Sequence, residues 1–86
     1  MDGFHYDWDD AEELDGNTIH IESAGVSQDE FQQVIEDPYA LEFVSRSSGR
    51  PGKRGRTHDG RTLIVIFEYL NLEDPTIIRP VTAWEE

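Results

Sequence analysis

The amino-acid sequence predicts an α+β domain, in which two N-terminal helices pack on one face of a mainly antiparallel sheet. The first observation behind this prediction is a helix-capping signal at residues 27–30, followed by apolar side chains at helical spacing. The second is an apolar run at residues 63–67 that suits the middle of a sheet. Because the helices precede a group of strands, the two kinds of element should form separate layers. A chain of 86 residues has room for one core, so residues 1–86 are expected to form one domain.

The first predicted elements are a short strand and a helix. Residues 3–8 alternate aromatic and polar side chains, which is typical of a half-buried strand. Asn17 is predicted to cap a helix that ends near Ala24. Gly25 follows at a position where the chain often needs a positive φ, and glycine adopts that conformation without steric cost.

The second helix has the strongest local signals. Ser27 and Glu30 have the spacing of a capping box, in which each side chain bonds to the backbone amide of the other residue. Three apolar residues of segment 31–35 share one helical face. Pro38 should end the helix, because proline disfavours helical geometry in the residue before it.

A strand and a loop are expected after this helix. Residues 40–45 predict a strand with alternating apolar side chains. Residues 46–55 contain three glycines and a proline among basic and serine residues, which indicates a flexible loop. That loop is expected to tighten into a short strand near residues 54–58.

A hairpin and a final strand complete the predicted sheet. Asp59-Gly60 is a dipeptide favoured in tight turns between strands. Residues 63–67 are apolar on both faces and should form a central strand. Residues 77–83 predict the last strand, and Pro80 removes one backbone donor from it. This strand should therefore lie at an edge or have an unused ladder position at Pro80.

The charge distribution is strongly uneven. The net charge is −12, which opposes general attraction to nucleic acid. Residues 1–45 contain thirteen acids and no lysine or arginine, whereas residues 46–61 contain six basic residues against Asp59 alone. One interpretation is that this basic segment neutralises acids within the fold or within a homodimer. The other is that it contacts phosphate or an acidic partner.

Several classes of protein are disfavoured by what the sequence lacks. The absence of cysteine excludes disulfides, thiolate zinc sites and a cysteine nucleophile. No apolar stretch approaches the roughly 20 residues that span a bilayer, and the acidic N-terminus is unlike a signal peptide, so a cytoplasmic location is expected. His5, His20 and His58 have no metal-ligand spacing, so neither a metal nor a cofactor is expected.

Three groups of segments together resemble the BrnT-type toxins of bacterial toxin–antitoxin pairs. They are residues 4–9 (FHYDWD), then residues 17–27 leading to Asp37-Pro38, and residues 55–61 (GRTHDGR) followed by residues 78–83 (IRPVTA). The resemblance implies a RelE-like fold, with a curved sheet and both N-terminal helices on one of its faces. It also implies a metal-independent endoribonuclease that inhibits translation, and a ribbon-helix-helix antitoxin as its partner.

The chain departs from these toxins in the charge that would face RNA. Relatives often carry basic residues after the last strand, whereas here Trp84-Glu85-Glu86 follow. The helix that is usually basic is acidic here, and residues 47–53 are polar and rich in glycine. These departures motivate an alternative, a non-catalytic relative of the same fold that binds a partner through its acidic surface.

Ribonuclease chemistry of this kind needs proton transfer and neutralisation of phosphate charge. Histidine suits the first task because its pKa lies near neutrality, and arginine suits the second because its planar group binds two phosphate oxygens. The predicted catalytic residues, with Tyr69 as a possible substitute for the last, are His58, Arg56, Arg61, Arg79 and Glu68. The alternative is that these are ordinary surface residues of a hairpin, with the arginines paired to acids.

Further residues are predicted to extend this site. Arg50, Lys53 and Arg54 belong to the basic segment and are expected to bind RNA. His20, on the first helix, is a candidate residue at the rim of the site, or else a structural histidine bonded to a strand or loop.

Overall fold

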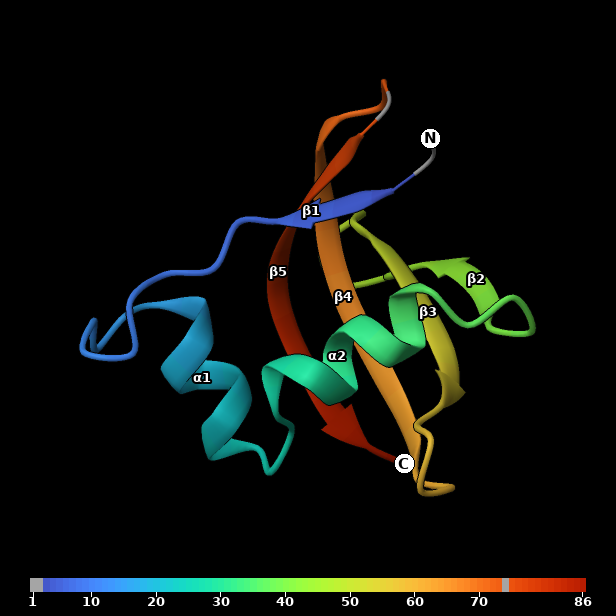
Figure 1. Cartoon of the computed structure of the whole chain (residues 1–86), viewed down its shortest axis with the longest axis horizontal. Coiled ribbons are helices and arrows are strands. Elements are labelled where there is room, and N and C mark those ends of the chain that lie inside the picture. The colour runs from blue at the N-terminus through green and yellow to red at the C-terminus, as the bar shows by residue number, and fades with distance from the viewer. Residues whose placement is uncertain (1–2, 74) are drawn as a thin grey trace.

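The computed structural model describes residues 3–73 and 75–86. It has the α+β architecture that the sequence predicts, with two helices and five strands in the described part of the chain (Figure 1). The elements follow in the order β1 (Phe4–Tyr6), α1 (Asn17–Ser23), α2 (Gln28–Ile35), β2 (Leu41–Val44), β3 (Pro51–Arg56), β4 (Thr62–Asn71) and β5 (Thr76–Glu85).

All five strands belong to one mixed sheet with the order β1-β5-β4-β3-β2. β1 pairs with β5 in parallel, and the other three pairings are antiparallel, so the prediction of a mainly antiparallel sheet is confirmed. The central strand is β4, which contains the apolar run 63–67, as predicted. The two edges of the sheet are β1 and β2.

The main core joins both helices to the centre of the sheet. Leu63, Val65 and Phe67 alternate along β4 and share one cluster with buried residues of the helices and of β5, namely Ile21, Phe31, Val34, Ile35, Ile78 and Ala83. α2 contacts β3 and β4, whereas α1 contacts β5 and lies beside that strand in Figure 1. The intervening residues of β4, Ile64 and Ile66, point to the opposite face of the sheet and are also buried.

The capping signals predicted for the second helix are confirmed. The Ser27 hydroxyl accepts a hydrogen bond from the Glu30 amide, and the Glu30 carboxylate accepts one from the Ser27 amide. Gly25, between the helices, has a φ of 83°, and Gly60, in the turn before β4, has a φ of 91°. Gly25 therefore adopts the left-handed conformation for which it was predicted, and the left-handed Gly60 lies in the tight turn predicted at Asp59-Gly60.

The predicted role of Asn17 as a helix cap is wrong. Gly16 is the N-cap of α1, and Asn17 is the first helical residue. Its buried side chain donates to the carbonyl oxygens of Asp7 and Pro80, at 3.0 and 2.9 Å, and accepts from the Asp9 amide at 2.8 Å. Asn17 thus provides hydrogen-bond partners for backbone groups of Asp7, Asp9 and Pro80. Leaving these groups unsatisfied would cost more free energy than leaving a short helix without a side-chain cap.

The predicted extent of the glycine-rich loop is also wrong, because β3 begins at Pro51. The two glycines of β3 lie where a larger side chain would collide with neighbouring residues. A Cβ atom on Gly52 would lie 2.6 Å from Cζ of Phe43 and 2.9 Å from Cδ1 of Ile66. A Cβ atom on Gly55 would lie 3.0 Å from that of Ala40. Glycine here marks close packing between neighbouring elements rather than a flexible segment.

Pro80 lies at an unused ladder position inside the sheet, which is the second of the two environments predicted for it. β5 lies between β1 and β4 and is not an edge strand, but β1 pairs with it only as far as Ile78. On the other side, the register shifts between Ile66 and Phe67, and Pro80 lies opposite Phe67. The amide that proline lacks therefore falls at an irregular position of the ladder.

Among the described residues, no helix combines the length and the apolar composition needed to cross a membrane.

Candidate functional site

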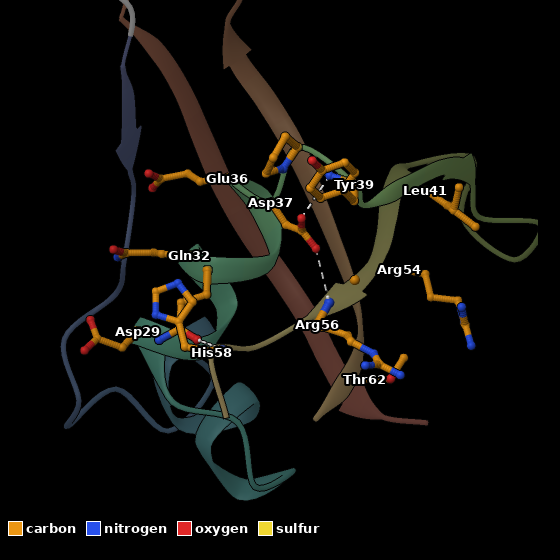
Figure 2. A pocket seen from close by; sticks show the side chains of 13 residues that line it. Asp29, Gln32, Glu36, Asp37, Tyr39, Leu41, Arg54, Arg56, His58 and Thr62 are labelled. Atoms are coloured by element: carbon orange, nitrogen blue, oxygen red, sulfur yellow. Dashed lines mark hydrogen bonds between the residues drawn. The ribbon is translucent and has the colours of Figure 1, made fainter. Parts of the chain in front are cut away.

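A surface groove lies between α2 and β3, next to the start of β2. It has a volume of about 1030 Å³ and is lined by two of the predicted catalytic residues, Arg56 and His58, and by Arg54. Figure 2 shows that the His58 ring lies on the side of Asp29 and Gln32, whereas the Arg56 side chain extends toward Thr62. The two side chains therefore do not point at one common position.

Side chains from α2 and from the residues after it bond to the uncovered edge of β3, and to the backbone just beyond it, in this groove. Asp37 accepts a hydrogen bond from the Arg56 amide at 3.3 Å and another from the Tyr39 amide at 2.9 Å. Gln33 accepts one from the His58 amide at 2.8 Å. Next to the start of β2, these side chains thus occupy backbone donors that a further strand would otherwise use.

The second groove has a volume of about 550 Å³ and contains four other residues of the predicted site. They are His20 from α1, Arg50 from the turn before β3, Glu68 from β4 and Arg79 from β5. Nε2 of His20 lies 3.0 Å from the hydroxyl oxygen of Thr82 on β5. His20 is therefore bonded to a strand residue, as the structural alternative for this histidine predicts. Nε of Arg50 lies 3.3 Å from a carboxylate oxygen of Glu68.

Arg79 is held by two carboxylates of the segment that follows β1. Its guanidinium group lies 3.1 Å from Asp7 and 2.9 Å from Asp9. The hydrogen bonds from Arg79, and then the bond from the Asn17 amide, lower the pKa of the Asp9 carboxyl. An arginine fixed in this way is not available to a phosphate unless these bonds break.

Arg61 links α2 to the end of β5. Its guanidinium group lies 2.5 Å from Glu30 and 3.1 Å from Glu85, and it also donates to the carbonyl oxygen of Gly25 at 2.9 Å. The pKa of the Glu30 carboxyl is lowered, first by the bond from the Ser27 amide and then by Arg61. Arg61 therefore has a structural role between elements that are distant in sequence.

The residues predicted to bind RNA also have partners within the chain. Arg54 forms an ion pair with Glu86 across the sheet. Nζ of Lys53 donates to the carbonyl oxygen of Ile35 at 2.8 Å, at the end of α2, and lies 3.7 Å from Glu42. A cation at this position suits the partial negative charge of a helix C-terminus.

The structure thus divides the predicted catalytic set among separate places. Arg56 and His58 line the first groove, Arg79 and Glu68 line the second, and Arg61 belongs to an ion-pair network. Within residues 3–73 and 75–86, no carboxylate lies within ion-pairing distance of the Arg56 side chain, unlike the other arginines of this set.

Sequence reasoning missed the acids that hold Arg79. Asp7 and Asp9 flank Trp8 in an extended segment, so they project to one side of it. That period-two spacing was the available signal, but it does not identify a partner 70 or 72 residues away.

The described part of the chain contains no cluster of three or more histidine, aspartate or glutamate side chains arranged to hold a metal ion. The chain matches no protein-family model, no curated protein and no solved structure.

The bonds that the Glu30 carboxylate accepts from the Ser27 amide and from Arg61 predict a pH-dependent contribution to stability. Because the folded chain lowers the pKa of Glu30, its stabilisation is present above the pKa of the unfolded state, roughly 4.3, and is lost as the pH falls through the lower folded pKa. Glu30→Gln should therefore be less stable than the wild type at pH 7, and this difference should shrink below about pH 4.

Urea unfolding of both proteins at pH 7 and pH 3 measures this difference. Glu22→Gln is a suitable control, because it removes the charge of an exposed acid on α1. A difference between the wild type and Glu30→Gln that stays constant over the whole pH range would contradict the assignment.

Proposed function

We propose that this chain is a divergent relative of the BrnT-like toxins that acts as a non-catalytic, partner-binding module. In this proposal the fold is RelE-like, with both helices on one face of a curved sheet, and the acidic surface binds a basic protein. The ordered sequence motifs and the α+β architecture support the relationship. The observation that carries the proposed function is that Arg61 and Arg79 are already bound by the chain's own carboxylates.

Electrostatics favours a basic partner over RNA. A net charge of −12 repels a polyanion and attracts a polycation. Binding a phosphate through Arg61 or Arg79 would require that ion pairs with Glu30, Glu85, Asp7 or Asp9 be broken. The acids released in this way would then face the incoming phosphate.

A metal-independent endoribonuclease is the second candidate function. The observation in its favour is that Arg56 and His58 line the same groove, with no carboxylate of the described residues close to the Arg56 side chain. In that case His58 would transfer a proton and Arg56 would bind phosphate. The ribbon-helix-helix antitoxin implied by the resemblance is a candidate partner under either function.

Binding to a lysine-rich polypeptide tests the proposed function. Poly-lysine should bind the wild-type chain, and its affinity should fall about tenfold or more between 50 and 300 mM salt, because ions screen contacts between exposed charges. Fluorescence anisotropy with labelled poly-lysine gives the affinity at each salt concentration. Labelled poly-glutamate is the matched control and should not bind.

A ribonuclease assay separates the two candidates. Single-stranded RNA incubated with the purified chain should remain intact, and the variants His58→Ala and Arg79→Ala should behave like the wild type. RNA cleavage that His58→Ala abolishes would favour the ribonuclease, and poly-lysine binding that is insensitive to salt would exclude the proposed electrostatic mode.

A further inference from the structure

We propose that the outer edge of β2 is the docking site of the partner, which adds there as one strand with alternating basic and apolar residues. This inference rests on the proposed function and specifies where and how the basic partner binds. It combines the backbone pattern of β2, its exposed side chains and the charge of the chain.

The backbone of β2 has free hydrogen-bonding groups on its outer side. Within residues 3–73 and 75–86, β2 is an edge strand of the sheet and pairs with β3 alone. The Ser45 amide donates to the carbonyl oxygen of Arg50, so this pair is a hydrogen-bonded one. Because such pairs alternate along an antiparallel ladder, Leu41 and Phe43 bond to β3. The amides and carbonyls of Glu42 and Val44 therefore point outward.

The side chains of β2 leave this edge open. Leu41 is 63% exposed and Val44 is 67% exposed, so each face of β2 presents a large apolar side chain to solvent. Edge strands are commonly protected by lysine or proline, and β2 contains neither; its one charged residue is Glu42, which disfavours pairing with an acidic strand rather than with a basic one. The neighbouring backbone differs, because Asp37 accepts from the Arg56 amide at the end of β3 and Gln33 accepts from the His58 amide just after it. The chain thus protects one part of this side of the sheet and leaves the other part available.

The two faces of β2 define the partner's pattern. Since side chains alternate along a strand, Glu42 and Val44 lie on one face, and Leu41 and Phe43 lie on the other. A strand added beside β2 places every second residue near Glu42. The Glu42 carboxylate lies 3.7 Å from Nζ of Lys53, but its side chain is 71% exposed, so it can also face a basic side chain of the partner. The remaining residues of the added strand lie beside Leu41 and Phe43, where apolar side chains are favoured.

Charge distinguishes a foreign partner from a second copy of this chain. Pairing two β2 strands would bring together two molecules that each carry a net charge of −12, and would place a Glu42 side chain in each of the paired strands. Like charges on adjacent strands are destabilising. A basic segment of another protein reverses the sign of both interactions, so it is the occupant that we propose.

Amide hydrogen exchange with a defined peptide tests this inference on the wild-type chain. The probe is a ten-residue synthetic peptide in which lysine and valine alternate, and the control replaces each lysine with glutamate. The lysine peptide should slow exchange of the Glu42 and Val44 amides about tenfold or more, because both become donors in a new ladder. The glutamate peptide should leave their exchange rates unchanged.

A proline variant tests the same edge independently. Val44→Pro removes an outward-facing amide without removing a bond to β3, so it should weaken binding of the lysine peptide about tenfold. Val44→Thr keeps the amide and the branched side chain, and its affinity should stay within about twofold of the wild type. Thermal unfolding shows whether both variants fold. If Val44→Pro does not fold, the exchange measurement on the wild-type chain remains the test of the docking site.

The outcomes separate this inference from the proposed function. If poly-lysine binds but the lysine peptide leaves the Glu42 and Val44 amides unprotected, the docking site is overturned and the acidic partner-binding function stands. If neither polycation binds, both proposals are overturned. Protection of these amides that grows with protein concentration in the absence of peptide would assign the edge to a second copy and overturn the proposed partner.

Discussion

Replacing Asn17 with alanine is expected to lower the free energy of unfolding by about 2–4 kcal/mol, because it leaves buried polar groups without partners. The Asn17 side chain is 6% exposed and bonds to three backbone groups, those of Asp7, Asp9 and Pro80. Alanine can satisfy none of them. The loss should also release the segment that carries Asp7 and Asp9, and with it the anchor of Arg79.

Urea unfolding of the variant measures this loss. Asn71→Ala is a matched control, because Asn71, at the end of β4, also bonds through its side chain to backbone groups, those of Glu73 and Pro75, but these bonds are exposed and water can replace them. Its cost should be less than about 1 kcal/mol. Equal losses in the two variants would contradict the structural role assigned to Asn17.

Gly52→Val is expected to disrupt both the packing of β2 and the binding of a partner. The new Cβ atom would lie 2.6 Å from the Phe43 ring and 2.9 Å from Ile66, so the ring must leave its position. Overpacking of this kind costs about 1–3 kcal/mol. Because Phe43 lies on β2, its displacement should also weaken binding of the alternating lysine–valine peptide.

Two measurements check this prediction, the midpoint of urea unfolding and the affinity for the peptide. Gly3→Ala is the control, since no atom lies within 4 Å of its added Cβ atom, and it should change neither value. An unchanged midpoint for Gly52→Val would show that the ring adjusts without loss of packing. An unchanged affinity would show that the peptide does not depend on the position of Phe43.

Local sequence signals predicted the parts of the fold that depend on neighbouring residues. The capping box at Ser27 and Glu30 and the turn at Gly60 are set by chemistry within a few residues, and both are confirmed. The apolar run of β4 identified the central strand because burial on both faces leaves few polar positions. The start of β3 was missed because Gly52 is required by Phe43 and Ile66, which come from other strands.

The candidate site depends still more on distant contacts. Sequence chemistry identified arginines suited to phosphate, and it also offered the alternative that they pair with acids of the same chain. Which alternative holds depends on contacts such as Arg61 with Glu30, 31 residues apart, and Arg79 with Asp9, 70 residues apart. No local pattern specifies such pairs, since they arise only when the sheet brings the segments together.

The hydrogen bonds of Asp37 and Gln33 to the edge of β3 limit how large a complex at this edge can become. With those donors occupied, an incoming segment can pair only along the four residues of β2. So short a ladder supports modest affinity, and the protruding Glu42 disfavours stacking of further identical chains. Complexes formed at this edge should therefore be short-lived and limited in size, which suits exchange between partners rather than permanent assembly or fibre growth.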